Sequence, residues 1–371
     1  MPPGGTPPPL PSPRPRRAPS GSGWKVAAIV LIILLALSLL GNFAGMLGTL
    51  ISANTPMASG GRMPMEEIVL ENNQSRHKIV VVPVEGMISD SLGNVGGSGM
   101  SGFIKDQLQA AADDSDVEAV ILKINSPGGE VLASDEIYRS ILEFQKEHEK
   151  PVIASMGSLA ASGGYYVAAP CRWIVANDLT ITGSIGVIMQ SYNYRGLMDK
   201  VGLRSEVFKS GRFKDMLSGT KAESDISDEE RAMVQRMVDE TFGRFKEVVQ
   251  EGRAWSRDQN ETDAGNAGRT LANDWTNYAD GRILSGKEAF ERGFVDELGN
   301  FKTAYERAIQ IADISSANVV QYRPIFSLGS LFRLLGQSEA KRSPAVKVDL
   351  GLPTPTLQPG LPYFLSPNYV R

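Results

Sequence analysis

Histidine, the most common general base in enzymes, is scarce in this chain, and this limits the chemistry that the chain could perform. There are only two histidines in 371 residues. His77 ends a polar stretch and His148 lies in a charged run at 147–150, whereas a Ser-His-Asp triad needs its base in a fixed core position. A nucleophilic serine in this chain would therefore need another base.

Three glycine-rich turns each follow a run of β-forming residues. They read Asn-Ser-Pro-Gly-Gly (125–129), Gly-Ser-Leu-Ala-Ala-Ser-Gly-Gly-Tyr-Tyr (157–166) and Thr-Gly-Ser-Ile-Gly (182–186). In parallel α/β folds ligands bind at strand ends, and small residues there let backbone N–H groups hold an oxyanion. Glycine is also the ordinary residue of turns with positive φ, so a purely structural role stays open. Phosphate binding is disfavoured, because no turn matches Gly-x-x-x-x-Gly-Lys-Ser/Thr or a full Gly-x-Gly-x-x-Gly.

Several serines and lysines in or near these turns are candidates for nucleophile and base. Ser162 would begin a helix through Tyr165 and Tyr166, where free N–H groups stabilise negative charge, but Ser158 is nearly as good a candidate. A lysine base must be neutral, so burial must lower its pKa from about 10.4 by roughly three units. The remaining candidates are Ser126, Ser155 and Ser184 among the serines, and Lys123, Lys200, Lys209 and Lys214 among the lysines, the last flanked by Phe213, Met216 and Leu217.

Hydrophobic periodicity switches repeatedly between strand-like and helical segments. The β-rich runs cover residues 79–84, 117–124, 152–156, 173–176, 185–188 and 205–208. Helical spacing occurs at 134–148, and Ser227 and Glu230 form a capping-box pattern ahead of a long helix. This alternation predicts an α/β fold with a largely parallel sheet, and no internal repeat of the catalytic unit is visible.

Composition excludes several classes of protein. The net charge of −4 offers no concentrated basic face for nucleic acid. The single cysteine, Cys171, cannot form an intrachain disulfide, and no Cys or His cluster has zinc-ligand spacing. We expect Cys171 to be a small buried residue, and we expect neither a metal nor a cofactor.

The amino-terminal region has the features of a membrane anchor. An apolar stretch within 24–51 is long enough to span a bilayer, and it follows Arg14, Arg16, Arg17 and Lys25. This charge bias predicts a single-pass protein of the cytoplasmic membrane, with its amino terminus in the cytoplasm and the rest outside; a cleaved secretory signal is the alternative. The expected organisation is a disordered tail (1–23), the anchor (24–51), a linker (52–77), a folded domain (78–315) and a Pro-rich tail (316–371).

In order along the chain, the three turns and the segment Lys-Ser-Gly-Arg-Phe-Lys-Asp (209–215) resemble the signal peptide peptidase A family, in its short single-copy form. The resemblance covers about 78–301 and implies a Clp protease/crotonase-like fold of repeated β-β-α units. It implies that Ser162 is the nucleophile, Lys214 the general base, and Gly129 and Gly163 the oxyanion donors. The polar loop at 258–279 is longer than the family pattern leads us to expect.

The resemblance also implies what the protein does. It would be a serine endopeptidase that cleaves remnant signal peptides or other unfolded apolar peptides outside the cytoplasmic membrane. Homo-oligomerisation is implied too, with serine and lysine contributed by one chain or by neighbouring chains. The alternatives are a protease with one dedicated membrane-protein partner, a non-catalytic peptide-binding scaffold, and a crotonase-like acyl-CoA enzyme, which export would separate from its cofactor.

Overall fold

The structure is a computed structural model that describes residues 25, 28–36, 38–39, 65–91, 99–261, 267–325 and 362–365. The chain divides into two units, Met1–Gly61 and Arg62–Arg371. In the first unit, residues 28–36 and 38–39 are helical. Within the described residues, no helix has both the length and the apolar character needed to cross a bilayer. The expected tail (1–23) lies outside the described residues, as does much of the expected anchor (24–51).

The second unit alternates strands and helices. Its strands are β1 (Met65–Glu71), β2 (Lys78–Glu85), β3 (Val117–Ser126), β4 (Gly128–Glu130), β5 (Val152–Ala160), β6 (Trp173–Ala176), β7 (Ile181–Gly183), β8 (Ile188–Met189), β9 (Ile283–Ser285), β10 (Glu297–Leu298), β11 (Asn318–Pro324) and β12 (Pro362–Leu365). Its helices are α2 (Met100–Asp113), α3 (Val131–His148), α4 (Gly163–Ala168), α5 (Arg195–Lys200), α6 (Asp228–Glu261), α7 (Gly286–Glu291) and α8 (Phe301–Ile311), with 3₁₀ helices η1 (Glu223–Asp225) and η2 (Trp275–Tyr278).

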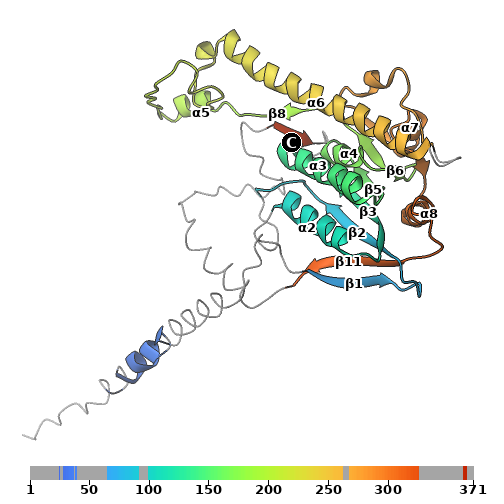
Figure 1. Cartoon of the computed structure of the whole chain (residues 1–371). Coiled ribbons are helices and arrows are strands. Elements are labelled where there is room, and N and C mark those ends of the chain that lie inside the picture. Colours follow the sequence, from blue (N-terminus) through green and yellow to red (C-terminus); the bar gives the residue numbers. More distant parts are fainter. Residues whose placement is uncertain are drawn as a thin grey trace, which may run out of the picture. The chain divides into compact units, whose positions relative to one another are not determined.

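A nine-stranded sheet forms the centre of this unit (Figure 1). Its main path is β1-β11-β2-β3-β5-β6-β10. Outside this path, β7 pairs with β5, and β9 pairs with β7. From β11 to β10 every neighbouring pair is parallel, and β1 pairs antiparallel with β11. The α/β class and the largely parallel sheet predicted from the sequence are therefore confirmed.

Side chains that alternate along the central strands supply two separate cores. Val80 and Leu122 belong to the larger core, which also contains buried residues of α2, α3 and α4. Ile79 and Ile121 belong to the second core, which α8 covers with Ala304. Because both faces of the sheet are covered, the strands read as continuous apolar runs rather than as an alternation.

Helix α6 spans 34 residues, and its two halves have different surroundings. The predicted capping box is present: the Ser227 N–H donates to the Glu230 carboxylate, and the Glu230 N–H donates to the Ser227 hydroxyl. The carboxyl-terminal half has one buried face, and it passes so close to the end of α4 that a Cβ on Gly252 would lie 2.5 Å from the Ala169 oxygen. The amino-terminal half extends toward α5 (Figure 1), and Met237 there is exposed.

Two predicted strands need correction. Residues 205–208 have no regular structure, and the side chain of Phe208 is 95% exposed, so no sheet edge covers the β-forming side chains. Of the run 185–188, only Ile188 enters a strand, β8.

The expected boundaries of the folded domain also need correction. Strand β1 lies in the expected linker, and β11 lies in the expected tail. The two strands pair with each other, and β11 pairs with β2. The main sheet therefore extends beyond 78–315 on both sides.

Candidate active site

Ser162 occupies the turn between β5 and α4 in a conformation that L-residues rarely adopt. Its φ is 54° and its ψ is −118°, a region that costs a non-glycine residue about 1–3 kcal/mol. The turn is fixed on both sides, because the Ser162 N–H donates to the Gly183 oxygen at 2.8 Å and the Ser162 oxygen accepts from the Tyr166 N–H at 2.8 Å. A strained serine between a strand and a helix is typical of a nucleophile elbow.

The Ser162 hydroxyl is buried and unpaired. The residue is 0% exposed, and within the part of the chain that the structure describes its Oγ has no hydrogen-bond partner. The competing serines have other environments: Ser158 is exposed, and Ser126 accepts a hydrogen bond from the Gly128 N–H at 3.1 Å. Buried polar groups are almost always paired, so an exception at a strained turn points to a function.

Glycines from two of the predicted turns converge next to Ser162. A Cβ on Gly163 would lie 3.0 Å from the Gly128 Cα and 3.1 Å from the Gly129 nitrogen. A Cβ on Gly128 would lie 2.6 Å from the Gly163 nitrogen. The backbones of the two predicted oxyanion donors, Gly129 and Gly163, are thus brought together beside the Ser162 turn, where glycine permits the close approach.

Neighbouring polar groups hold the first glycine turn in place. The Ile88 N–H donates to Gly128, and the Glu130 N–H donates back to Ile88. The Glu130 carboxylate accepts from the Ser89 hydroxyl at 2.7 Å. A Cβ on Gly129 would meet the Ile88 oxygen at 1.9 Å, so only glycine fits at this position.

The carboxyl-terminal strand β12 pairs with this turn. It is the middle strand of a small antiparallel sheet, between β4 and β8. Phe364 is 0% exposed and contacts two aromatic rings, Tyr166 at 4.9 Å and Phe245 at 4.7 Å between centroids. Tyr166 is itself fixed, because its hydroxyl donates to Asp135 at 2.7 Å, and burial, with this bond, raises its pKa.

Lys214 lies outside this cluster of residues. It belongs to a turn in the segment 190–227, which connects β8 to α6, and its backbone N–H donates to Gly211 at 3.2 Å. The side chain is exposed, so the burial expected of a lysine base is not found in the isolated chain. Apolar side chains of the same segment are exposed too: Tyr192, Tyr194, Leu197, Val201, Leu203, Val207, Phe208 and Leu217.

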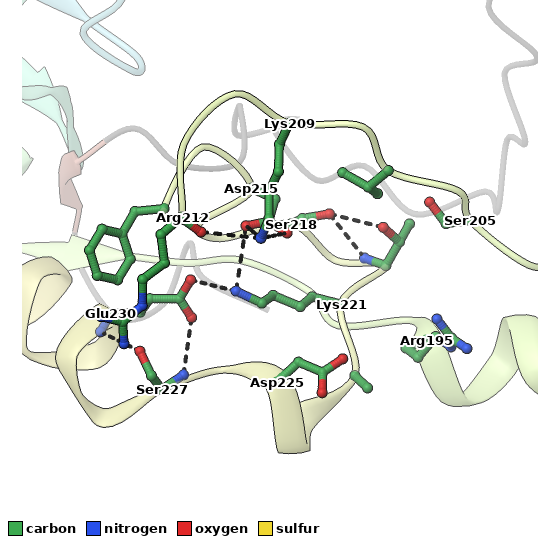
Figure 2. Close-up of a pocket in the computed structure, with 14 residues that line it drawn as sticks. Arg195, Ser205, Lys209, Arg212, Asp215, Ser218, Lys221, Asp225, Ser227 and Glu230 are labelled. Atoms are coloured by element: carbon green, nitrogen blue, oxygen red, sulfur yellow. Dashed lines mark hydrogen bonds and ion pairs between the residues drawn. The ribbon is translucent and has the colours of Figure 1, made fainter.

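A charged pocket of about 470 Å³ adjoins the turn that carries Lys214. Figure 2 shows Lys209, Lys221, Asp215 and Glu230 directed toward one another, with Lys209 2.8 Å from Asp215 and Lys221 2.5 Å from Glu230. The hydrogen bond that Lys209 donates to Asp215 lowers the pKa of Asp215, and the hydrogen bond that Lys221 donates to Glu230 raises the pKa of Lys221. These pairs tie the turn to the start of α6.

The other residues singled out in the sequence are peripheral. The His77 Nδ1 pairs with Glu118 at 2.7 Å at the edge of the sheet, and the His148 ring packs against Phe144. Cys171 is fully buried, as predicted, and burial raises its pKa, which disfavours a reactive thiolate.

Residues 144–272 match peptidase family S49. The chain is also 34% identical over 271 residues to a putative signal peptide peptidase SppA of Enterococcus faecium, with 71% of this chain and 72% of that protein covered. The chain belongs to peptidase family S49. The predicted recognition is therefore confirmed, and the S49 match includes both Ser162 and Lys214.

Other S49-type relatives differ in length. A putative protease of Synechocystis sp. is 35% identical over 248 residues, covering 66% of this chain and 78% of that protein. Protease 4 of Haemophilus influenzae is 34% identical over 255 residues, which cover 38% of its length. Among solved structures, the 1510-N membrane-bound stomatin-specific protease matches 68% of this chain with a TM-score of 0.38 and 13% identity. As an S49 member, the chain is a serine peptidase, which confirms the predicted enzyme class.

Sequence reasoning missed the cluster of aromatic rings formed by Tyr166, Phe245 and Phe364. Phe245 lies in the long helix predicted after Ser227, and Phe364 lies in the Pro-rich tail, for which no structure was expected. A signal was present for Tyr166, which directly follows the glycine turn of Ser162. No local pattern could pair Phe364 with a helix more than a hundred residues earlier.

Proposed function

We propose that this S49 peptidase is a membrane-anchored endopeptidase that cleaves remnant signal peptides or other unfolded apolar peptides outside the cytoplasmic membrane. Ser162 would be the nucleophile and Lys214 the general base, on a fold of the Clp protease/crotonase type. The observation that carries the proposal is the strained, buried and unpaired Ser162 beside the converging Gly129 and Gly163.

The chemistry is acyl transfer. Neutral Lys214 accepts the proton of the Ser162 hydroxyl as its oxygen attacks the peptide carbonyl. The N–H groups of Gly129 and Gly163 hold the oxyanion, and lysine then protonates the departing amine. Water hydrolyses the acyl-enzyme and restores the serine.

A neighbouring subunit supplies Lys214 in this proposal. The exposed Lys214 and the exposed apolar side chains on the same 190–227 segment support an arrangement in which this segment packs against a second copy. Burial there would desolvate the lysine and lower its pKa toward the neutral form. The expected assembly is a homo-oligomer with its active sites on the outer face of the cytoplasmic membrane.

The test uses full-length protein in detergent and a fluorogenic apolar peptide. Ser162→Ala and Lys214→Ala should each lower kcat/KM by at least about 10³-fold, and Lys302→Ala, which alters an exposed lysine on α8 outside the 190–227 segment, should retain wild-type turnover. Mixing the two inactive variants during assembly should restore part of the activity, because some interfaces then carry both groups. Wild-type activity in either Ser162→Ala or Lys214→Ala would refute the assignment of the catalytic residues. Inactive mixtures would refute a site shared between two subunits.

A further inference from the structure

Asp215 directly follows the candidate base, and its side chain is held inside the 190–227 segment. The backbone there makes i→i−3 hydrogen bonds, from the Lys214 N–H to Gly211 and from the Met216 N–H to Phe213. Successive side chains in a turn of this kind point about 120° apart. The Asp215 side chain is only 14% exposed, whereas Lys214 is exposed. The direction of Lys214 therefore depends on what holds Asp215.

Two lysines hold the Asp215 carboxylate, one from each side of it in the sequence (Figure 2). The Lys209 ammonium donates to both carboxylate oxygens at 2.8 Å, and the Lys221 ammonium lies 3.5 Å from one of them. Lys209 also donates to the Arg212 oxygen at 3.1 Å, so it holds the backbone ahead of Lys214 as well. Hydrogen bonds between ionised groups are about twice as strong as neutral ones.

The chain of ion pairs ends at the buried start of α6. Lys221 lies 2.5 Å from Glu230, whose carboxylate also accepts from the Ser227 N–H at 3.1 Å. The exposed fraction of the side chains falls along the chain, from 34% at Lys209 to 4% at Glu230. Asp215 is thus connected through Lys221 to a fixed point of the fold.

The same chain balances the negative charge that lies next to the candidate base. A nearby carboxylate stabilises the ammonium form of a lysine, which cannot accept a proton. The two lysines and two carboxylates of the chain compensate each other, so the charge of Asp215 is offset where it lies. Two arginines that line the pocket, Arg195 and Arg212, pair with Asp199 and Glu229 instead.

We propose that Asp215, held by Lys209 and Lys221, is the positioning residue that directs Lys214 away from its own segment and toward Ser162. The inference rests on the proposed function, because it deepens the assignment of Lys214 as the base. Asp215 acts through Lys214 and takes no part in the proton transfer itself. Misplacing a catalytic group by about 1 Å can cost on the order of 10²-fold in rate.

Steady-state kinetics of full-length protein in detergent tests this role. Asp215→Asn keeps the size of the side chain and removes its charge, and it should lower kcat for a fluorogenic apolar peptide about 10- to 100-fold with KM unchanged. Lys209→Met should also lower kcat, and the double variant should match Asp215→Asn, because both changes break one ion pair. Glu306→Gln, which alters an exposed carboxylate on α8, should retain wild-type kinetics. Wild-type kcat in Asp215→Asn, or losses that multiply in the double variant, would overturn the inference.

Mixed assemblies distinguish positioning of the lysine from a general loss of structure. The parent mixture combines Ser162→Ala with Lys214→Ala, so an active interface takes its lysine from the first variant. Adding Asp215→Asn to the first variant should lower the restored activity about 10- to 100-fold. Adding it to the second variant should leave that activity in place, because this subunit supplies no lysine. Equal losses in the two mixtures would show a structural role and overturn the inference.

These outcomes separate the inference from the proposed function. If Lys214→Ala is inactive and Asp215→Asn has wild-type kcat, the positioning role fails and the Ser-Lys peptidase stands. If Lys214→Ala retains wild-type turnover, the assignment of the base fails, whatever Asp215→Asn does. If the parent mixture is inactive, the site shared between subunits fails, and the kinetics of Asp215→Asn alone decide the positioning role.

Discussion

Replacing Ser162 should abolish activity and yet stabilise the fold. The hydroxyl is buried without a partner, and burying an unsatisfied polar group costs about 1–3 kcal/mol. Ser162→Ala removes that group but keeps the unfavourable φ of 54°. Ser162→Gly also removes about 1–3 kcal/mol of backbone strain, less about 0.5–1 kcal/mol for the added flexibility of glycine.

The expected order of stability, from lowest to highest, is therefore wild type, Ser162→Ala and Ser162→Gly. For a domain of this size, about 1 kcal/mol corresponds to about 2–4 °C in Tm. Alanine should raise Tm by about 2–12 °C, and glycine should raise it by a few degrees more. Both variants should be inactive on every peptide.

The assay is thermal unfolding of full-length protein, with all variants built on Lys214→Ala. This background removes any lysine that a neighbouring chain could place on the hydroxyl, so the comparison reports the environment within one chain. If Ser162→Ala unfolds at a lower temperature than its parent, the hydroxyl makes a stabilising contact, and the argument from an unpaired nucleophile is wrong.

Three further predictions concern the charged turn, the oxyanion donors and the base. Glu230→Gln should destabilise the 190–227 segment at neutral pH. The hydrogen bond from Lys221 lowers the pKa of Glu230 in the folded protein. The stabilisation that the wild-type carboxylate provides is therefore complete above about pH 4.3, its pKa in the unfolded chain, and is lost as the pH falls through the lower folded pKa. Hydrogen exchange measured against pH should show this loss in wild type only. Gly163→Ala should lower kcat by about 10²–10³-fold with little change in KM, since its Cβ would crowd the Gly129 nitrogen at 3.1 Å; steady-state kinetics checks this. Lys214→Arg should be as inactive as Lys214→Ala in the same peptide assay, because a guanidinium stays protonated.

Each of these expectations has an opposing result. Equal protection of the 190–227 segment in wild type and Glu230→Gln at neutral pH would show that the ion pair does not order it. Wild-type kcat in Gly163→Ala would remove that amide from the oxyanion site. Turnover by the arginine variant would exclude proton transfer as the role of the lysine.

The central strands and the serine turn could be predicted because their signals are local. The runs at 79–84, 117–124 and 152–156 are continuously apolar, which is what burial on both faces of a parallel sheet requires. The capping box at Ser227 is a four-residue pattern. The four motifs in order identified the family, and the glycines of the first two turns lie next to each other in the structure.

The missed elements depend on distant partners. Strands β1 and β11 pair across some 250 residues of sequence. Strand β1 is mostly exposed and has no buried-strand pattern, and in β11 only Val319, Val320 and Tyr322 are buried. Strand β12 is four residues long and depends on β4 and β8 for all of its pairing. At Phe208 a strand was predicted where the structure has none. The prediction used β-propensity alone, whereas this exposed segment joins no sheet.

The position of Lys214 shows the limit of reasoning from one chain. A lysine base must be neutral, which predicts burial, and the apolar neighbours Phe213 and Leu217 are compatible with it; these residues and Lys214 itself are accessible in the isolated chain. In the proposed assembly, the second copy would determine the environment of Lys214. Sequence motifs can point to such a residue, whereas its burial would depend on the interface.

Covalent labelling of full-length protein with a peptide β-lactone, followed by peptide mapping, tests the central claim most directly. The account predicts a single acylated residue, Ser162, with labelling absent in Ser162→Ala, at least about 100-fold slower in Lys214→Ala and unchanged in Lys302→Ala. Acylation of another serine, or labelling of Lys214→Ala at the wild-type rate, would contradict the assignment of nucleophile and base.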